Sequence, residues 1–374
     1  MEKNRYMNVY ANENTIFPKV DKNSKTYINA NYIHDVILST TESSDAKEGE
    51  DNSIQPHFIA CQAPLPHIVP DFYETVYEHN IHLILMVTSL TEKGILKADR
   101  YWPKSYKENG TEENELQEAD LSNICDHFDD FVWSASPEND PKRNETVKKT
   151  RAGNFLLWND DTLFPYRQDT KLQLVERVFF VQKVGNEKIL KVRQVQYVGW
   201  PDHGIPLVTD SFDALLRLIT NYKNAMANND AYYNMIPPVM VHCSAGIGRT
   251  GTLLAAYTAL EVLGNKERDA VTPFRNDTIR NIVVSLRQKR FGMVQTFAQY
   301  CFIYLVVLKY IKESRGGLDA FDAEGFTDYI NKNCDAAQMA IYSAIQNNAM
   351  RNKKPNGGGD GNKCVTQSTK GFCQ

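Results

Sequence analysis

Apolar residues in the second half of the chain follow the spacing of strands. Residues 172–184 and 189–198 are rich in valine, phenylalanine, tyrosine and leucine, and Gly185-Asn186 lies between them. This pattern predicts two strands joined by a turn. Met240-Val241-His242 follows two prolines and predicts a further short, buried strand.

Two later stretches carry apolar residues at helical spacing. Residues 250–263 include Leu253, Leu254, Tyr257 and Leu260, and Gly264 follows as a suitable C-terminal cap. Residues 297–311 predict a second apolar helix. Strands interleaved with helices favour an α/β domain with a highly twisted mixed β-sheet flanked by helices.

Polar stretches divide the chain. We expect one domain over residues 1–315, with insertions or long loops near 41–53 and within 107–150. Beyond it, residues 316–352 predict a C-terminal extension with one helix at 336–350. The glycine-rich stretch 353–374 predicts a disordered tail.

Composition and charge exclude several classes of protein. The chain has 374 residues and a formal net charge of -4, so a broad basic surface for nucleic acid is not expected. The longest apolar run, residues 300–308, is too short for a membrane span, and residues 1–6 are too polar for a signal peptide. Oligomeric state stays open.

The cysteines point to a reducing compartment. There are seven, an odd number, without close pairs or the spacing of metal ligands. We therefore expect free thiols, no metal and a cytoplasmic location. Four of the cysteines are expected to be small residues in or near the core: Cys61, Cys125, Cys301 and Cys334.

The segment 241–251 combines a cysteine, a loop of mostly small residues and an arginine. Cys243 follows the predicted buried strand, and Arg249 opens the predicted helix after five intervening residues. Such a short loop lets successive backbone N–H groups point inward, toward an anion that also meets the helix N-terminus. Arg249 adds a two-pronged donor for phosphate oxygens. The loop residues expected to hold the anion are Ser244, Ala245, Gly246, Ile247 and Gly248.

The same surroundings activate the sulfur. A helix N-terminus and a cation lower a cysteine pKa by roughly one to five units, which supplies a thiolate able to attack phosphorus. Thr250 is placed to hydrogen-bond this sulfur. A lone buried cysteine or a glycine-rich loop is weak evidence for catalysis, but here nucleophile, anion loop and arginine occur together. No Gly-Lys-Ser/Thr motif is present, so a nucleotide phosphate loop is excluded.

This segment resembles the His-Cys-x5-Arg-Thr signature of the cysteine-dependent phosphatases. Other stretches resemble the tyrosine-specific branch, the protein tyrosine phosphatases, over residues 3 to about 312. They are Lys3-Asn4-Arg5-Tyr6, Tyr27-Ile28-Asn29-Ala30-Asn31, residues 58–65, Asp71-Phe72-Tyr73, Glu92-Lys93-Gly94 with Lys97, Tyr101-Trp102-Pro103, residues 200–204 and residues 295–300.

The resemblance implies phosphotyrosine hydrolysis in two displacements, without metal or cofactor. Asp202, in Trp200-Pro201-Asp202, matches the acid that protonates the leaving tyrosyl oxygen and then deprotonates water. Gln295 matches the glutamine that positions this water, and Gln299 assists. Phosphotyrosine-containing proteins are the implied partners.

The resemblance also implies a set of substrate-binding residues. Tyr6 matches the tyrosine that walls the pocket and sets its depth, so that phosphotyrosine reaches Cys243 and the shorter phosphoserine does not. Glu92 resembles the acidic residue that braces the arginine, and Lys97 the lysine that contacts the acid loop. Asn8 stands where the family usually has a substrate-binding aspartate.

Further features set this chain apart from the usual pattern. Ala63 replaces the glycine of the family's Gln-Gly-Pro turn. The family's N-terminal helices are missing before Tyr6, so we expect either that the sequence is a fragment or that the substrate loop is less well supported. Arg287 and Arg290 precede the glutamine loop, and we expect them on the solvated surface. Two rival functions remain open: a phosphatase of broader specificity, and a phosphotyrosine-binding module without activity.

Overall fold

The computed structural model describes residues 3–18, 26–34, 36, 58–105, 116–121, 148–160, 163–201, 204–206, 209–229, 236–264 and 277–313. The predicted loop at 41–53, the predicted C-terminal helix and tail, Cys125, Cys334 and Asp202 lie outside these ranges.

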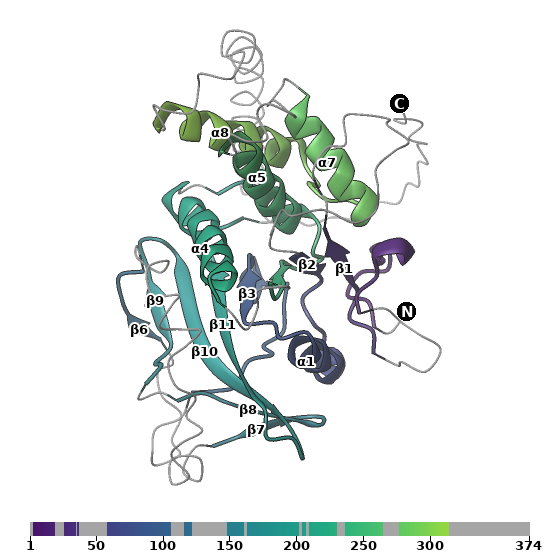
Figure 1. Cartoon of the computed structure of the whole chain (residues 1–374), viewed down its shortest axis with the longest axis vertical. Coiled ribbons are helices and arrows are strands. Elements are labelled where there is room, and N and C mark those ends of the chain that lie inside the picture. Colours follow the sequence, from purple (N-terminus) through teal and green to yellow (C-terminus); the bar gives the residue numbers. More distant parts are fainter. Residues whose placement is uncertain are drawn as a thin grey trace, which may run out of the picture.

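A mixed sheet forms the centre of the described chain (Figure 1). Its strands run in the order β1-β2-β12-β3-β11-β10-β8-β7, while β9 pairs with β10 and β6 with β9. Their bounds are β1 Ala30–Ile33, β2 Phe58–Cys61, β3 Leu83–Met86, β6 Gln117–Glu118, β7 Thr150–Ala152, β8 Phe155–Trp158, β9 Arg167–Asp169, β10 Leu174–Lys183, β11 Ile189–Tyr197 and β12 Val239–His242. A separate hairpin joins β4 Thr91–Glu92 to β5 Ile95–Leu96.

The four central strands, β2, β12, β3 and β11, run parallel to one another. Strand β12 lies between β2 and β3, parallel to both, and β3 is also parallel to β11. Strands β2, β3 and β12 are buried on both faces, which explains their near-continuous apolar sequences. The carboxyl ends of β2, β12 and β3 therefore meet at one edge of the sheet, where Cys243 follows β12.

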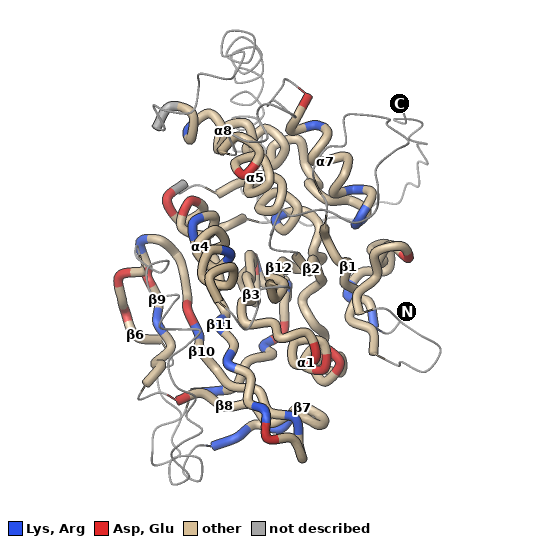
Figure 2. The backbone as a smooth tube through the Cα atoms, viewed as in Figure 1, with Lys and Arg blue, Asp and Glu red and all other residues tan. Residues whose placement is uncertain are grey.

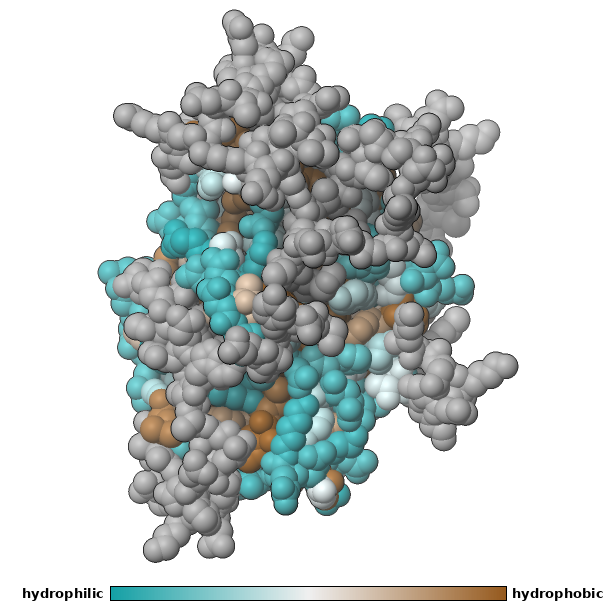
Figure 3. Space-filling model, viewed as in Figure 1, coloured by the Kyte–Doolittle hydropathy of each residue, from teal (hydrophilic) through white to brown (hydrophobic). Residues whose placement is uncertain are grey.

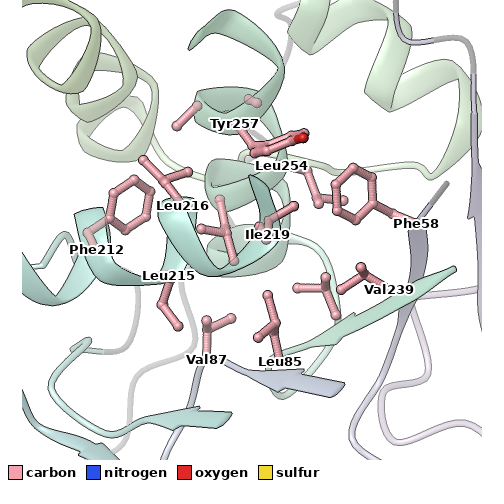
Figure 4. Close-up of a cluster of buried hydrophobic side chains, with 14 of the residues drawn as sticks. Phe58, Leu85, Val87, Phe212, Leu215, Leu216, Ile219, Val239, Leu254 and Tyr257 are labelled. Carbon is pink, nitrogen blue, oxygen red and sulfur yellow. The ribbon is translucent and has the colours of Figure 1, made fainter. Parts of the chain in front are cut away.

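Alternate residues of these strands enter two separate cores. In β12, Val239 and Val241 face one core and Met240 the other, as the two-residue period of a strand requires. The first core lies under α4 Thr209–Ala227 and α5 Gly248–Gly264. Figure 4 shows Leu85 and Val239 from the sheet, with Val87 just beyond β3, facing Phe212, Leu215 and Ile219 of α4.

Helices cover both faces of the sheet (Figure 1). On the face of α4 and α5, α7 Thr278–Lys289 and α8 Phe297–Glu313 pack against α5. On the other face, α1 Val69–Glu78 contributes Phe72, Tyr73 and Val76 to the second core. Two short 3-10 helices complete the elements, η1 Glu13–Thr15 and η2 Pro66–Ile68.

The structure confirms the predicted α/β class and the strongest predicted elements. Strands β10 and β11 pair antiparallel across a turn at Gly185, and β12, α5 and α8 occupy the predicted positions. The predicted region 107–150 is only partly described. There, β6 pairs in parallel with β9 and Leu121 is buried, so this part joins the sheet and the first core rather than forming a loop alone.

The surface of the described residues is mostly polar. Acidic and basic positions are interspersed along the chain, with basic positions gathered at the C-terminal end of α7 (Figure 2). On the face in Figure 3, apolar patches are visible among hydrophilic residues. Within the described ranges, no helix combines the length and the apolar character that crossing a bilayer requires.

Candidate active site

The segment 243–247 forms a loop between β12 and α5. Its first residue, Cys243, follows the buried strand, and α5 begins at Gly248 with Arg249 in its first turn. The first amides of a helix lack partners within the helix and carry its positive end. The sulfur of Cys243 is thus placed beside a site suited to an anion.

Every backbone carbonyl oxygen of the loop accepts a hydrogen bond from a group that surrounds the loop, so each carbonyl points outward. The donors are the His242 ring for Cys243, the Ala63 amide for Ser244, the Arg290 guanidinium for Ala245 and Gly246, and the Gly251 and Val294 amides for Ile247. Since the N–H and C=O groups of a peptide unit point in opposite directions, fixing the carbonyls outward directs the loop amides inward. The loop is therefore a preformed cradle for an oxyanion.

Gly246 is required by this geometry. Its φ of +73° lies in the left-handed region, and an added Cβ would lie 2.0 Å from the backbone oxygen of Cys61. Its amide nitrogen lies 3.2 Å from Cys243 Sγ and donates to it. Any side chain here would displace the loop from β2 and disturb a donor to the sulfur.

The surroundings lower the pKa of Cys243. Burial raises it, but the charge of Arg249 and hydrogen bonds from Thr250 and Gly246 together outweigh burial, so the thiolate is favoured. Within the described part of the chain, the Thr250 hydroxyl is buried without an oxygen or nitrogen partner, which leaves it to the sulfur. Cys243, Arg249 and Thr250, singled out together in the sequence, are thus close together in the structure.

Arg249 is held by a two-pronged ion pair. Its NH1 and NH2 lie 2.5 and 2.7 Å from the two carboxylate oxygens of Glu92 on β4. NH1 also donates to the Thr88 hydroxyl at 2.9 Å, and that hydroxyl donates to Glu92 at 2.9 Å. The guanidinium is 3% exposed on its side chain, so its orientation is fixed before any ligand arrives.

Arg290 corrects an expectation. We expected it on the solvated surface, but it is fully buried and donates to the carbonyls of Ala245 and Gly246 and to the side chains of Asn29 and Asn31. Burial lowers the pKa of its guanidinium to about 10. It supports the outer side of the loop. Arg287 is exposed, as expected, and lines the pocket beside the loop.

A pocket of about 570 Å³ opens above the loop. It brings together most of the residues singled out in the sequence: Tyr6, Asn8, Lys97, Cys243, Ser244, Ala245, Ile247, Gly248, Arg249, Gln295 and Gln299. Val9, Arg287, Phe291 and Gly292 complete its lining. Glu92, Gly246 and Thr250 lie behind this lining, in contact with Arg249 or Cys243.

The segment carrying Tyr6 is fixed by Arg5. Arg5 donates to the carbonyls of Ala63 and Pro64 and forms an ion pair with Asp99 at 2.6 Å. Tyr6 then lies over the loop, with its hydroxyl 2.7 Å from Ser244 Oγ. Ala63 is buried without a positive φ, so its methyl group fits this turn.

Gln295 precedes α8 and Gln299 lies in its first turn, and both side chains approach the start of α5 on the pocket side. An added Cβ on Gly248 would lie 3.0 Å from Gln295 Oε1 and 3.2 Å from Gln299 Nε2. Gln299 also closes a capping box, because its oxygen accepts from the Thr296 amide while Thr296 Oγ1 accepts from the Gln299 amide. Gln295 is exposed and lacks such a structural task in the described contacts.

The predicted acid loop is described only on either side of Asp202. Trp200 is buried against Phe212 and Phe302, and its Nε1 donates to Gly204 O at 2.9 Å. Asp202 itself lies outside the described residues, so its role remains a prediction from sequence.

His242 is neutral across the physiological range, because burial lowers its pKa from 6.5 to about 4. The unfolded chain therefore binds this proton at a higher pH than the folded chain does. The stabilisation is complete above pH 6.5 and is lost as the pH falls toward 4. The difference corresponds to about 3 kcal/mol.

Urea unfolding at several pH values tests this. Between pH 7 and 4, wild type should lose about 3 kcal/mol more than His242→Asn, whose amide keeps a donor for the Cys243 carbonyl but does not titrate. An identical pH dependence in both proteins would contradict the assignment of this proton to His242.

Comparisons with known proteins indicate one family. The family model described as Protein-tyrosine phosphatase matches residues 1–183 and 164–309. The rat protein named Tyrosine-protein phosphatase non-receptor type 20 is 30% identical over 311 residues, covering 83% of this chain and 55% of its own. Human Tyrosine-protein phosphatase non-receptor type 4 is 29% identical over 313 residues, 84% of this chain and 25% of its own.

A solved structure extends the likeness to three dimensions. The Trypanosoma brucei Protein Tyrosine Phosphatase TbPTP1 superposes with a TM-score of 0.57 at 35% identity, covering 85% of this chain and 84% of that one. Fold and site together place a buried cysteine of lowered pKa in a loop of inward-facing amides at the end of a parallel strand. The chain belongs to the protein-tyrosine phosphatase family. It spans about half the length of the rat relative.

Proposed function

We propose that this protein hydrolyses phosphotyrosine in proteins through a phosphocysteine intermediate. The observation that carries the proposal is the loop 243–249, where outward carbonyls, a fixed guanidinium and a lowered thiol pKa converge on one sulfur. Membership of the phosphatase family supports it.

The reaction has two displacements. The Cys243 thiolate attacks phosphorus, the bond from phosphorus to the tyrosyl oxygen breaks, and Asp202 gives its proton to that oxygen. Gln295 then positions a water, which loses its proton to Asp202 as it attacks phosphorus. The phosphorus–sulfur bond breaks, and inorganic phosphate leaves the restored thiolate. Arg249 and the loop amides stabilise the phosphoryl oxygens in both steps.

Pocket shape favours tyrosine over serine or threonine. The half-buried Tyr6 stands over the loop and is anchored through Ser244, whose hydroxyl also donates to Lys97 O at 2.5 Å. A phosphate on a long aromatic side chain reaches past this wall to the sulfur. A phosphate on a short side chain would require the peptide backbone to enter the pocket.

Turnover of matched peptides tests the specificity. Peptides differing only in phosphotyrosine or phosphothreonine should give hydrolysis of the first and near-background release from the second. Equal kcat/KM values would instead favour a phosphatase of broader specificity. Binding of the phosphotyrosine peptide without hydrolysis of it or of para-nitrophenyl phosphate would favour a binding module.

The proposed location is the cytoplasm. The mechanism needs a reduced sulfur, and the cysteines in the described residues, Cys61, Cys243 and Cys301, are free thiols. Such thiols persist in a reducing compartment.

A further inference from the structure

A buried arginine lies beneath the active site on β10. Arg177 is 5% exposed, and its guanidinium stacks 4.2 Å from the centre of the Trp102 ring. Its NH1 donates to Gln194 Oε1 at 3.1 Å and to Gln196 Oε1 at 2.9 Å. Both glutamines lie on β11, Gln194 directly opposite Arg177 and Gln196 two residues further along the same face.

Arg177 determines which way both amides point. A guanidinium only donates hydrogen bonds, so the glutamine atoms that face it must be oxygens. The amide nitrogens are then directed away from Arg177. Gln194 Nε2 donates to Tyr101 Oη at 2.7 Å, and Gln196 Nε2 donates to Thr88 O at 2.9 Å.

The hydrogen bonds that start at Gln194, the first arm of the network, lead through Tyr101 and His242 to the Cys243 carbonyl. Tyr101 Oη lies 2.7 Å from His242 Nε2, and His242 Nδ1 lies 3.0 Å from the carbonyl oxygen of Cys243. A carbonyl only accepts, so Nδ1 of the neutral ring carries the proton and Nε2 accepts. Tyr101 must therefore donate to His242, as it is free to do when Gln194 donates to it. The tautomer is fixed from both ends.

The hydrogen bonds that start at Gln196, the second arm of the network, lead through Thr88 to Arg249. Gln196 fixes the backbone of Thr88, and the Thr88 hydroxyl accepts from Arg249 and donates to Glu92. These are the contacts that hold the guanidinium in place. Arg177, Gln194 and Gln196 thus form one buried hydrogen-bonded set, the Arg177 network. It connects to the Cys243 carbonyl through Tyr101 and His242, and to Arg249 through Thr88.

We propose that Arg177 is a positioning residue of this active site. Through Gln194 it orients the hydrogen bonds that fix the loop at Cys243, and through Gln196 those that fix Arg249. The proposal rests on the function proposed above. Without Arg177, Gln194 is free to rotate its amide and accept the Tyr101 proton, which removes it from His242 and frees the Cys243 carbonyl to turn.

The test measures the thiol directly. Iodoacetamide alkylation of Cys243, followed by mass spectrometry across a pH series, gives the ionisation midpoint without relying on turnover. Arg177→Met and Gln194→Met should each raise this midpoint by about half a unit to one unit, the effect of losing one neutral hydrogen bond. The other groups that interact electrostatically with this sulfur, Arg249, Arg290 and Cys61, are unchanged in these variants.

Glu176→Gln is the matched control. Glu176 is the residue before Arg177 on β10, is similarly buried at 4% exposure, and pairs with Arg193 and Arg167 outside the Arg177 network. It should lower the melting temperature but leave the midpoint unchanged. A midpoint equal to wild type in both methionine variants, or an equal shift in Glu176→Gln, would overturn the proposal. If Arg177→Met does not fold, Gln194→Met decides.

The second arm has its own readout. Gln196→Met should weaken vanadate binding by about three- to tenfold, because Arg249 is less well held. Unchanged vanadate affinity would overturn this arm. If the wild-type enzyme hydrolyses phosphotyrosine and the variants have its alkylation midpoint and vanadate affinity, only the positioning role is rejected. A wild-type thiol with an ordinary midpoint and no turnover rejects the proposed function itself.

Discussion

Cys243→Ser is expected to abolish phosphotyrosine turnover while leaving phosphotyrosine binding intact. A serine hydroxyl stays protonated where the cysteine is a thiolate, so no phosphoenzyme forms. We expect kcat to fall by roughly 10⁴-fold or more, the scale of losing a catalytic nucleophile. Binding persists because the loop amides, Arg249 and its Glu92 partner are unchanged.

Steady-state kinetics and calorimetric binding of a phosphotyrosine peptide check this result. Cys301→Ser is the control, since Cys301 is also a buried free thiol but does not line the pocket. It should keep nearly full activity. Substantial turnover by Cys243→Ser, or loss of peptide binding in a folded variant, would contradict the assigned role of the sulfur.

Asp202→Ala is expected to slow hydrolysis of phosphotyrosine peptides by roughly 10²–10⁴-fold, the usual contribution of a general acid. The loss should be smaller for para-nitrophenyl phosphate, whose leaving group needs less protonation. Because the acid must be protonated to act, the fall of wild-type kcat/KM at high pH should disappear in the variant. Substrate should also remain trapped on the enzyme.

The control for this variant is Asp210→Ala. Asp210 lies close in sequence, in the first turn of α4, and its side chain is 76% exposed. It should behave as wild type in the same assays. If Asp202→Ala retained wild-type rates on phosphotyrosine, another group would have to supply the proton.

Local patterns were sufficient to predict the elements that carry the site. The alternation in β10 and β11, the apolar run of β12 and the helical spacing of α5 depend on neighbours in sequence. The motif from Cys243 to Arg249 is equally local, because its strand, loop and helix are continuous. These predictions were confirmed for the fold, and all the loop residues except Gly246 line the pocket.

Arg290 shows what the sequence could not reveal. Arginines at a helix end are usually solvated, and the acceptors that bury this one are far away along the chain. Asn31 and Asn29 precede it by 259 and 261 positions. The same holds for Arg177, whose importance depends on the order of strands: β12 lies between β2 and β3, and β11 beside β3.

The most direct test of the account is the titration of Cys243 in the wild-type protein, with and without vanadate. We predict an alkylation midpoint well below that of free cysteine and complete protection by vanadate bound in the loop. A thiol that ionises only near the value of free cysteine, and that vanadate does not protect, would contradict the central claim.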